Sequence, residues 1–94
     1  MVESVFQAKV IKEIKQRMPG AIVNKGDSSQ GYPDYIICYK DKWAALEFKK
    51  EENAKHQPNQ DLYIDIINDW TMAAFIYPEN KKEVLHEFYA FFGV

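Results

Sequence analysis

Cysteine and histidine are scarce in this sequence, and their scarcity excludes two kinds of protein. The one cysteine, Cys38, cannot form an intrachain disulfide, which favours a reducing compartment. One cysteine and two histidines are too few for a structural zinc site of the Cys/His type. The sequence also has no apolar run near the roughly 20 residues of a membrane span, and its first residues lack a signal-peptide pattern. We therefore expect a cytoplasmic protein that does not bind to a membrane.

A strong excess of charge of one sign is lacking as well. The formal net charge is −2, which excludes a generic polybasic nucleic-acid binder but leaves room for an enzyme with a local charge arrangement. The 94 residues allow one domain, predicted to span 1–94. Apolar residues make up 47% and charged residues 28%, as in an ordinary globular chain, so we expect a modest but real core.

Two periodicities divide the chain into helices and strands. The segment 3–18 carries apolar residues at the spacing of an amphipathic helix, and Pro19 and Gly20 end it. The segment 43–49 alternates, so that Glu47 and Lys49 share one face of a strand. The sequence predicts helices over 3–18, 59–70 and 79–92, and strands over 21–23, 35–39, 43–49 and 72–77. This α-β-β-β-α-β-α order predicts an α/β fold with a mixed central sheet flanked by helices.

Two short motifs carry the chemistry expected of this chain. Gly31-Tyr32-Pro33-Asp34 places an acid where a loop enters a strand, and Glu47-Phe48-Lys49 places an acid and a base on the next strand. If these strands form a hairpin, Asp34 approaches Glu47 at one sheet edge. Two converging carboxylates repel unless a cation lies between them, and Mg²⁺ or Mn²⁺ suits oxygen ligands. The backbone carbonyl of Phe48 is a further candidate ligand, and Lys49 could orient the attacking water in metal-assisted phosphodiester hydrolysis.

These motifs resemble the PD-(D/E)xK signature of a nuclease superfamily. Together with Glu3 in the first helix and Gln60 eleven residues after Lys49, the set resembles the VRR-NUC family, particularly its small stand-alone phage members. The resemblance implies a restriction-endonuclease-like core. It implies that Asp34 and Glu47 bind metal with help from Glu3, and that Lys49 and Gln60 are catalytic. It further implies a homodimer that cuts branched DNA such as Holliday junctions, with no nucleotide cofactor.

Other interpretations of the same residues remain open. Asp34 could cap a turn, and Glu47 with Lys49 could form a weak ion pair on a solvated edge strand. Glu3 could simply favour the helix dipole, and Gln60 could be an exposed first-turn residue. His56 is expected to be solvated. The rival functions are a non-catalytic nucleic-acid or protein-binding module, and a flap or single-strand nuclease.

The last helix is unusually apolar for so small a domain. Its tail, 88–92, holds four aromatic residues, and its apolar stripe is wide. Such a surplus often marks an interface, which is a second reason to expect a homodimer.

Overall fold

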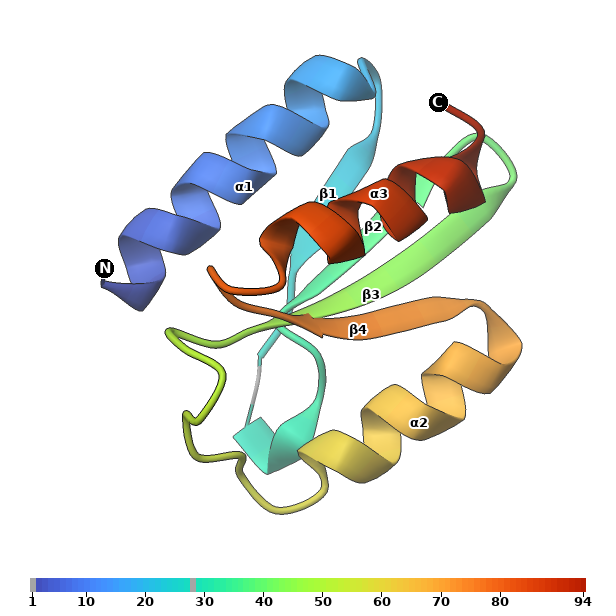
Figure 1. Cartoon of the computed structure of the whole chain (residues 1–94). Helices are drawn as coiled ribbons and strands as arrows, with labels where there is room; N and C mark the ends of the chain where they lie inside the picture. Colours follow the sequence, from blue (N-terminus) through green and yellow to red (C-terminus); the bar gives the residue numbers. More distant parts are fainter. Residues whose placement is uncertain (1, 28) are drawn as a thin grey trace.

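The structure is a computed structural model that describes residues 2–27 and 29–94. Three helices and four strands follow one another in the predicted α-β-β-β-α-β-α order, with one short 3₁₀ turn between the first two strands (Figure 1). The elements are α1 (Glu3–Arg17), β1 (Ile22–Lys25), η1 (Ser29–Gly31), β2 (Tyr35–Tyr39), β3 (Lys42–Phe48), α2 (Gln60–Trp70), β4 (Met72–Ile76) and α3 (Lys81–Phe92). The α/β fold class predicted from the sequence is confirmed.

The strands form one mixed sheet in the order β1-β2-β3-β4. Neighbouring strands are antiparallel from β1 to β3, whereas β4 returns through α2 to lie parallel to β3. The hairpin between β2 and β3 turns at Lys40 and Asp41, and Lys40 takes a positive φ of 58° in place of the usual glycine. This topology makes β3 an interior strand, and the residues from Ala44 to Phe48 are buried on both of its faces.

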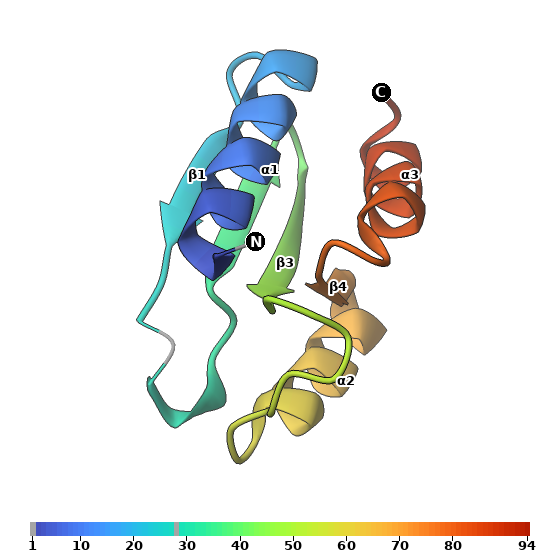
Figure 2. The ribbon, with the colours of Figure 1, turned by 60° about the vertical axis from the view of Figure 1, so that its left-hand side comes forward.

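Helices cover the two faces of the sheet unequally. Figures 1 and 2 show α1 and α3 together on one face and α2 on the other. Ala44, Leu46 and Phe48 point into the larger core under α1 and α3. Ala45 points the other way and packs with Ile64 of α2 and Ala73 of β4. The alternation predicted for 43–49 is therefore present, and it places Glu47 on the α2 face.

Tertiary contacts move several element boundaries from their predicted positions. β1 runs past the predicted 21–23 because Asn24 and Lys25 pair with Ile36 and Tyr35, and backbone pairing does not require apolar side chains. β3 begins one residue early, at Lys42, because Lys42 pairs with Tyr39 across the hairpin.

Both later helices begin after their predicted start. The sequence predicted a start at 59, but Asn59 has φ 73° and α2 begins at Gln60. Glu79 was predicted in the first turn of the last helix, yet α3 begins at Lys81 and its first-turn acid is Glu83. The delay follows from Asn80, whose Oδ1 accepts the Tyr77 N–H at 2.8 Å and whose amide donates to the Phe75 carbonyl at 3.0 Å.

The apolar stripe of α3 is used inside the molecule. Its large side chains are buried against the sheet and α1: Val84, Leu85, Phe88, Tyr89 and Phe92. The core therefore accounts for most of the apolar width of α3, which no longer gives a separate reason to expect a homodimer. Among the described residues, no helix is long and apolar enough to cross a membrane.

Candidate active site

Asp34 and Glu47 meet at the open end of the β2–β3 hairpin, opposite its turn. Tyr35 pairs with Leu46, so Asp34 and Glu47 are the next residues along the two strands. The Asp34 N–H donates to Glu47 Oε1 at 3.1 Å, and the N–H of the next residue on β3, Phe48, donates to Asp34 Oδ2 at 2.9 Å. The antiparallel register thus brings together two acids that are thirteen residues apart in sequence.

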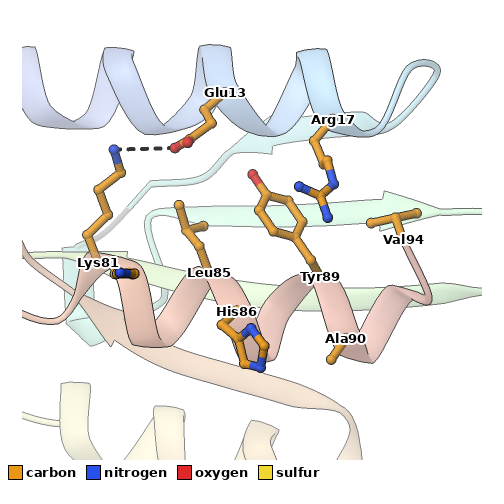
Figure 3. Close-up of a pocket in the computed structure, with 9 residues that line it drawn as sticks. Glu13, Arg17, Lys81, Leu85, His86, Tyr89, Ala90 and Val94 are labelled. Carbon is orange, nitrogen blue, oxygen red and sulfur yellow. Dashed lines mark ion pairs between the residues drawn. The ribbon is translucent and has the colours of Figure 1, made fainter.

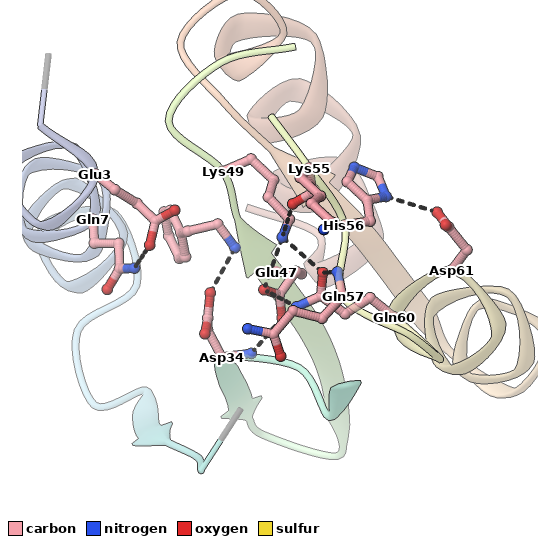
Figure 4. A network of polar contacts seen from close by, with 11 residues as sticks. Glu3, Gln7, Asp34, Glu47, Lys49, Lys55, His56, Gln57, Gln60 and Asp61 are labelled. Atoms are coloured by element: carbon pink, nitrogen blue, oxygen red, sulfur yellow. Dashed lines mark hydrogen bonds and ion pairs between the residues drawn. The ribbon is translucent and has the colours of Figure 1, made fainter. Parts of the chain in front are cut away.

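Lys49 and Gln60 complete this cluster from the end of β3 and the start of α2. Lys49 Nζ donates to Gln60 Oε1 at 2.7 Å and to the Lys55 carbonyl at 3.3 Å, and it lies 3.9 Å from Glu47 Oε2. Gln60 Nε2 donates in turn to Glu47 Oε2 at 2.9 Å. Figure 4 shows the network gathered where β2 begins and β3 ends, with α1 on one side and α2 on the other.

All four side chains are buried, although all four are polar. Their exposed fractions are 9% for Asp34, 3% for Glu47, 7% for Lys49 and 2% for Gln60. Burial of an ionisable group is costly unless it is paired, so such clusters are retained chiefly where their chemistry is used. The solvated edge-strand interpretation of Glu47 and Lys49 does not hold, because β3 is interior and both side chains are covered.

Glu47 is the acid whose charge is most strongly affected by this environment. Burial, and next the nearby Asp34 carboxylate, raise the pKa of Glu47 from 4.5 to about 8, although Lys49 partly opposes the shift. With the protein groups alone, Glu47 therefore holds a proton at neutral pH. Two ionised carboxylates at this site would need more positive charge than the single ammonium of Lys49 supplies.

Gly31 fixes the position of Gln60 relative to Asp34. Gly31 has φ +86°, and a Cβ there would lie 2.6 Å from the Pro58 carbonyl oxygen and 2.9 Å from the Gln60 backbone nitrogen. Only glycine allows η1 to pack so closely against the start of α2. Gln60 is further held by the Gln57 N–H, which donates to its Oε1 at 2.9 Å. The glycine of the Gly31–Asp34 motif thus has a structural reason.

Glu3 is placed differently from the other predicted site residues. It lies in the first turn of α1, half-buried, and its Oε2 accepts a hydrogen bond from Gln7 Nε2 at 3.2 Å. Within residues 2–27 and 29–94, no three acidic, histidine or cysteine side chains form a group suited to a metal ion. The structure thus joins Asp34, Glu47, Lys49 and Gln60 but does not bring Glu3 into contact with them.

Two aromatic contacts near this cluster were not foreseen from the sequence. His56, which was expected to be solvated, keeps 30% of its side chain exposed, and its ring also stacks on Phe75 at 4.2 Å between centroids while its Nδ1 lies 2.9 Å from Asp61 Oδ1. Tyr32, next to the Pro33-Asp34 pair, stacks on Tyr63 of α2 at 4.9 Å. Both contacts join a loop to another element, so neither leaves a periodic signal in the sequence.

Comparisons with known proteins give one informative likeness. No family model matches this chain, and no curated protein matches it. A solved structure described as a VRR_NUC domain superposes with a TM-score of 0.53 and 25% sequence identity, over 74% of this chain and 81% of that chain. This likeness supports the VRR-NUC family and indicates a nuclease-type fold.

Proposed function

We propose that this protein is a metal-dependent endonuclease that hydrolyses phosphodiester bonds in DNA. The observation that carries the proposal is the buried network of two acids, one lysine and one glutamine, where β2 begins and β3 ends. The nuclease-type fold of the VRR_NUC domain to which this chain is similar supports DNA as the substrate.

The donor atoms of this site fit Mg²⁺ or Mn²⁺. Asp34 and Glu47 supply hard carboxylate oxygens, and the Phe48 carbonyl is a third candidate ligand. Glu3, which does not contact these groups, would contribute through water. Asp34 Oδ2 accepts a hydrogen bond from the Phe48 N–H at 2.9 Å, which holds the Asp34 carboxylate beside Glu47. The raised pKa of Glu47 supports this proposal, because a bound cation would offset the burial and the Asp34 charge that raise it. When bound, such an ion supplies positive charge that polarises a phosphodiester and eases deprotonation of water.

Lys49 is the chain's own cation in the site. Its ammonium is fixed by Gln60 Oε1 and the Lys55 carbonyl rather than free on the surface. A charge that is already in place costs no reorganisation when negative charge develops on phosphate oxygens during attack. We therefore assign Lys49 the stabilisation of that charge and the orientation of the attacking water.

Gln60 acts through its neighbours. Its amide accepts from Lys49 and donates to Glu47, so it separates the ammonium from the carboxylate and fixes both. Without this bridge, Lys49 could collapse onto Glu47 as a tight ion pair. We assign Gln60 the positioning of Lys49 and Glu47.

The substrate is proposed to be branched DNA, such as a Holliday junction, cut by a homodimer. Two copies would bring two sites to two strands of one junction. The exposed face of α2, with Leu62, Ile66 and Trp70 one turn apart, is the surface proposed for the second copy. A flap or single-strand nuclease with the same site is the alternative, and a comparison of DNA substrates separates the two.

The catalytic assignment is tested with one lysine and its neighbour. Lys49→Ala is expected to lower the rate of Mg²⁺-dependent cleavage by at least about 100-fold. The variant loses the fixed positive charge that stabilises the negative charge developing on the phosphate oxygens. Lys50→Ala is the matched control: Lys50 is adjacent but exposed, so its loss should change the rate little. Rates are measured on four-way junctions, flaps, duplex and single strands.

Metal binding is tested separately by calorimetry with Mn²⁺. Asp34→Asn should abolish the binding heat, while Lys49→Ala should retain it. Cleavage by Lys49→Ala at the wild-type rate would refute its catalytic role. If Mn²⁺ binds but no DNA substrate is cut, the chain is a binding module rather than an enzyme.

A further inference from the structure

A groove lies between the C-terminal half of α1 and the length of α3, away from the acidic cluster. Its volume is about 470 Å³, within the range of small-molecule sites. Glu13 and Lys81 join the two helices across it with an ion pair of 3.3 Å (Figure 3). Beyond this bridge the groove is lined by Arg17, Lys82, Leu85 and Tyr89, among others.

The Tyr89 hydroxyl is the unusual group in this groove. Tyr89 is only 9% exposed, and among the described residues its hydroxyl is the one buried side-chain polar atom without a hydrogen-bond partner. Figure 3 shows it directed toward α1, between Glu13 and Arg17. Burial, and next Glu13, raise the pKa of Tyr89, so the hydroxyl stays protonated and able to donate. A buried donor without a partner is costly and calls for a ligand.

The charge of the groove defines what that ligand is. Arg17, Lys81 and Lys82 face a single acid, Glu13, so the lining is clearly positive in a chain whose net charge is −2. Arg17 lies over the Tyr89 ring at 4.7 Å, which places its guanidinium beside the hydroxyl. Lys81 and Lys82 also stand at the start of α3, where positive charge opposes the helix dipole unless an anion is near. A dianion offsets this excess better than a single carboxylate.

We propose that this groove binds a phosphate monoester. Its phosphate is held by Arg17, Lys82 and the Tyr89 hydroxyl, and its organic part packs on the apolar lining that includes Leu85. A phosphate monoester carries close to two negative charges at neutral pH and offers several acceptor oxygens, matching both the charge and the donor set. The site is independent of the nuclease proposal, since it shares no residue with the acidic cluster.

The test uses phenyl phosphate as the probe, with EDTA present so that no metal contributes. Amide signals of α1 and α3 around the groove should shift in ¹H–¹⁵N spectra as phenyl phosphate is added. Benzoate, with the same ring but one charge, should bind clearly more weakly. Tyr89→Phe removes only the hydroxyl and should weaken phenyl phosphate binding by about tenfold, as should Arg17→Gln.

Matched variants separate this site from the rest of the molecule. Lys15→Gln, on the exposed face of α1 outside the groove, should leave the affinity unchanged within about twofold. Lys49→Ala should also bind normally, so a failed nuclease assignment does not affect the result. Absence of shifts around the groove, equal binding of benzoate, or normal binding by Tyr89→Phe would each overturn the proposal.

The same titration identifies the source of the phosphate. A free 5′-deoxynucleotide and a short 5′-phosphorylated oligonucleotide both carry a phosphate monoester. Tighter binding of the oligonucleotide than of its unphosphorylated form would support a site for strand ends. Tighter binding of the free nucleotide would support a site for a small phosphorylated ligand.

Discussion

Glu47 is the residue whose charge couples the site to the stability of the fold. Its pKa is about 8 in the folded chain and near 4.5 when the chain unfolds, so the folded state binds its proton more tightly. The stabilisation from this proton is complete below pH 4.5 and is lost as the pH rises through 8. In metal-free protein, the Glu47 contribution to stability should therefore fall between these values.

Urea unfolding of wild type and Glu47→Gln in EDTA measures this contribution. The difference in unfolding free energy between the two proteins should shift against the wild type as the pH rises from 5 to 8, about the window given by the raised pKa. Taking the difference removes the titration of carboxylates elsewhere. A difference that stays constant with pH would show that Glu47 is not protonated in the folded state.

The variant Gln60→Ala tests whether a buried amide that does not contact the substrate affects the rate of the reaction. Gln60→Ala leaves Lys49 and Glu47 each without one partner, so we expect a loss of about 1–3 kcal/mol in stability. We expect kcat to fall about tenfold or more with a smaller change in KM, because positioning residues act on the reaction step. Gln57→Ala is the control, since Gln57 hydrogen-bonds Gln60 through its backbone, which the substitution keeps. Equal kcat for both variants would contradict the positioning role.

The sequence was informative at positions where spacing alone determines proximity. Strand alternation placed Glu47 and Lys49 on one face, and the hairpin brought Asp34 opposite Glu47, as the structure shows. The unpartnered Tyr89 hydroxyl could not be foreseen, because it depends on how α1 and α3 pack together. Similarly, His56 contacts Phe75 through a loop whose path no periodic pattern specifies.

At the scale of elements, the contact between η1 and α2 fixes the position of Gln60 relative to Asp34. Gly31→Ala places a methyl group 2.6 Å from the Pro58 carbonyl oxygen and also strains a positive φ. We expect the free energy of unfolding to fall by about 3 kcal/mol, because the left-handed backbone and the overpacking both destabilise the fold. Cleavage should fall as well, because Gln60 must move away from Lys49.

Gly20→Ala is the matched control for this prediction. Gly20 has nearly the same φ, +89°, but nothing lies within 4 Å of its added Cβ. The free energy of unfolding of Gly20→Ala should fall only by the cost of the left-handed backbone, about 1–2 kcal/mol, and its cleavage rate should be normal. Urea midpoints and cleavage rates of both variants measure the two effects. Equal losses would show that the packing of η1 on α2 does not determine the geometry of the site.

Element order was predictable, whereas several element ends were not. Helical and alternating apolar patterns identified all seven main elements, since each must bury one face. The end of β1 is determined by pairing with β2, which is a tertiary contact that no apolar pattern specifies. The start of α3 is determined by local hydrogen bonds of the Asn80 side chain to Tyr77 and Phe75, which an apolar pattern also does not report.

At the scale of the whole molecule, apolar surface is distributed unevenly between the helices. Most of the apolar side chains of α3 are buried in the core. On α2, in contrast, Leu62, Ile66 and Trp70 remain exposed, at 55%, 36% and 69%. These residues recur every fourth position and so follow one face of the helix. A continuous exposed apolar stripe in so small a domain is a candidate contact between two copies.

The homodimer prediction can therefore be tested on α2 rather than α3. Sedimentation at micromolar concentrations should show a species of twice the chain mass, and Trp70→Lys should shift it to monomer, because a charge on the stripe is costly to bury. Val5→Lys changes a similarly exposed apolar residue on α1 and should leave the dimer intact. If the dimer holds two sites on one junction, Trp70→Lys should impair paired cuts on four-way junctions more than cutting of single flaps. A wild-type protein that sediments as a monomer at every concentration would contradict this assembly.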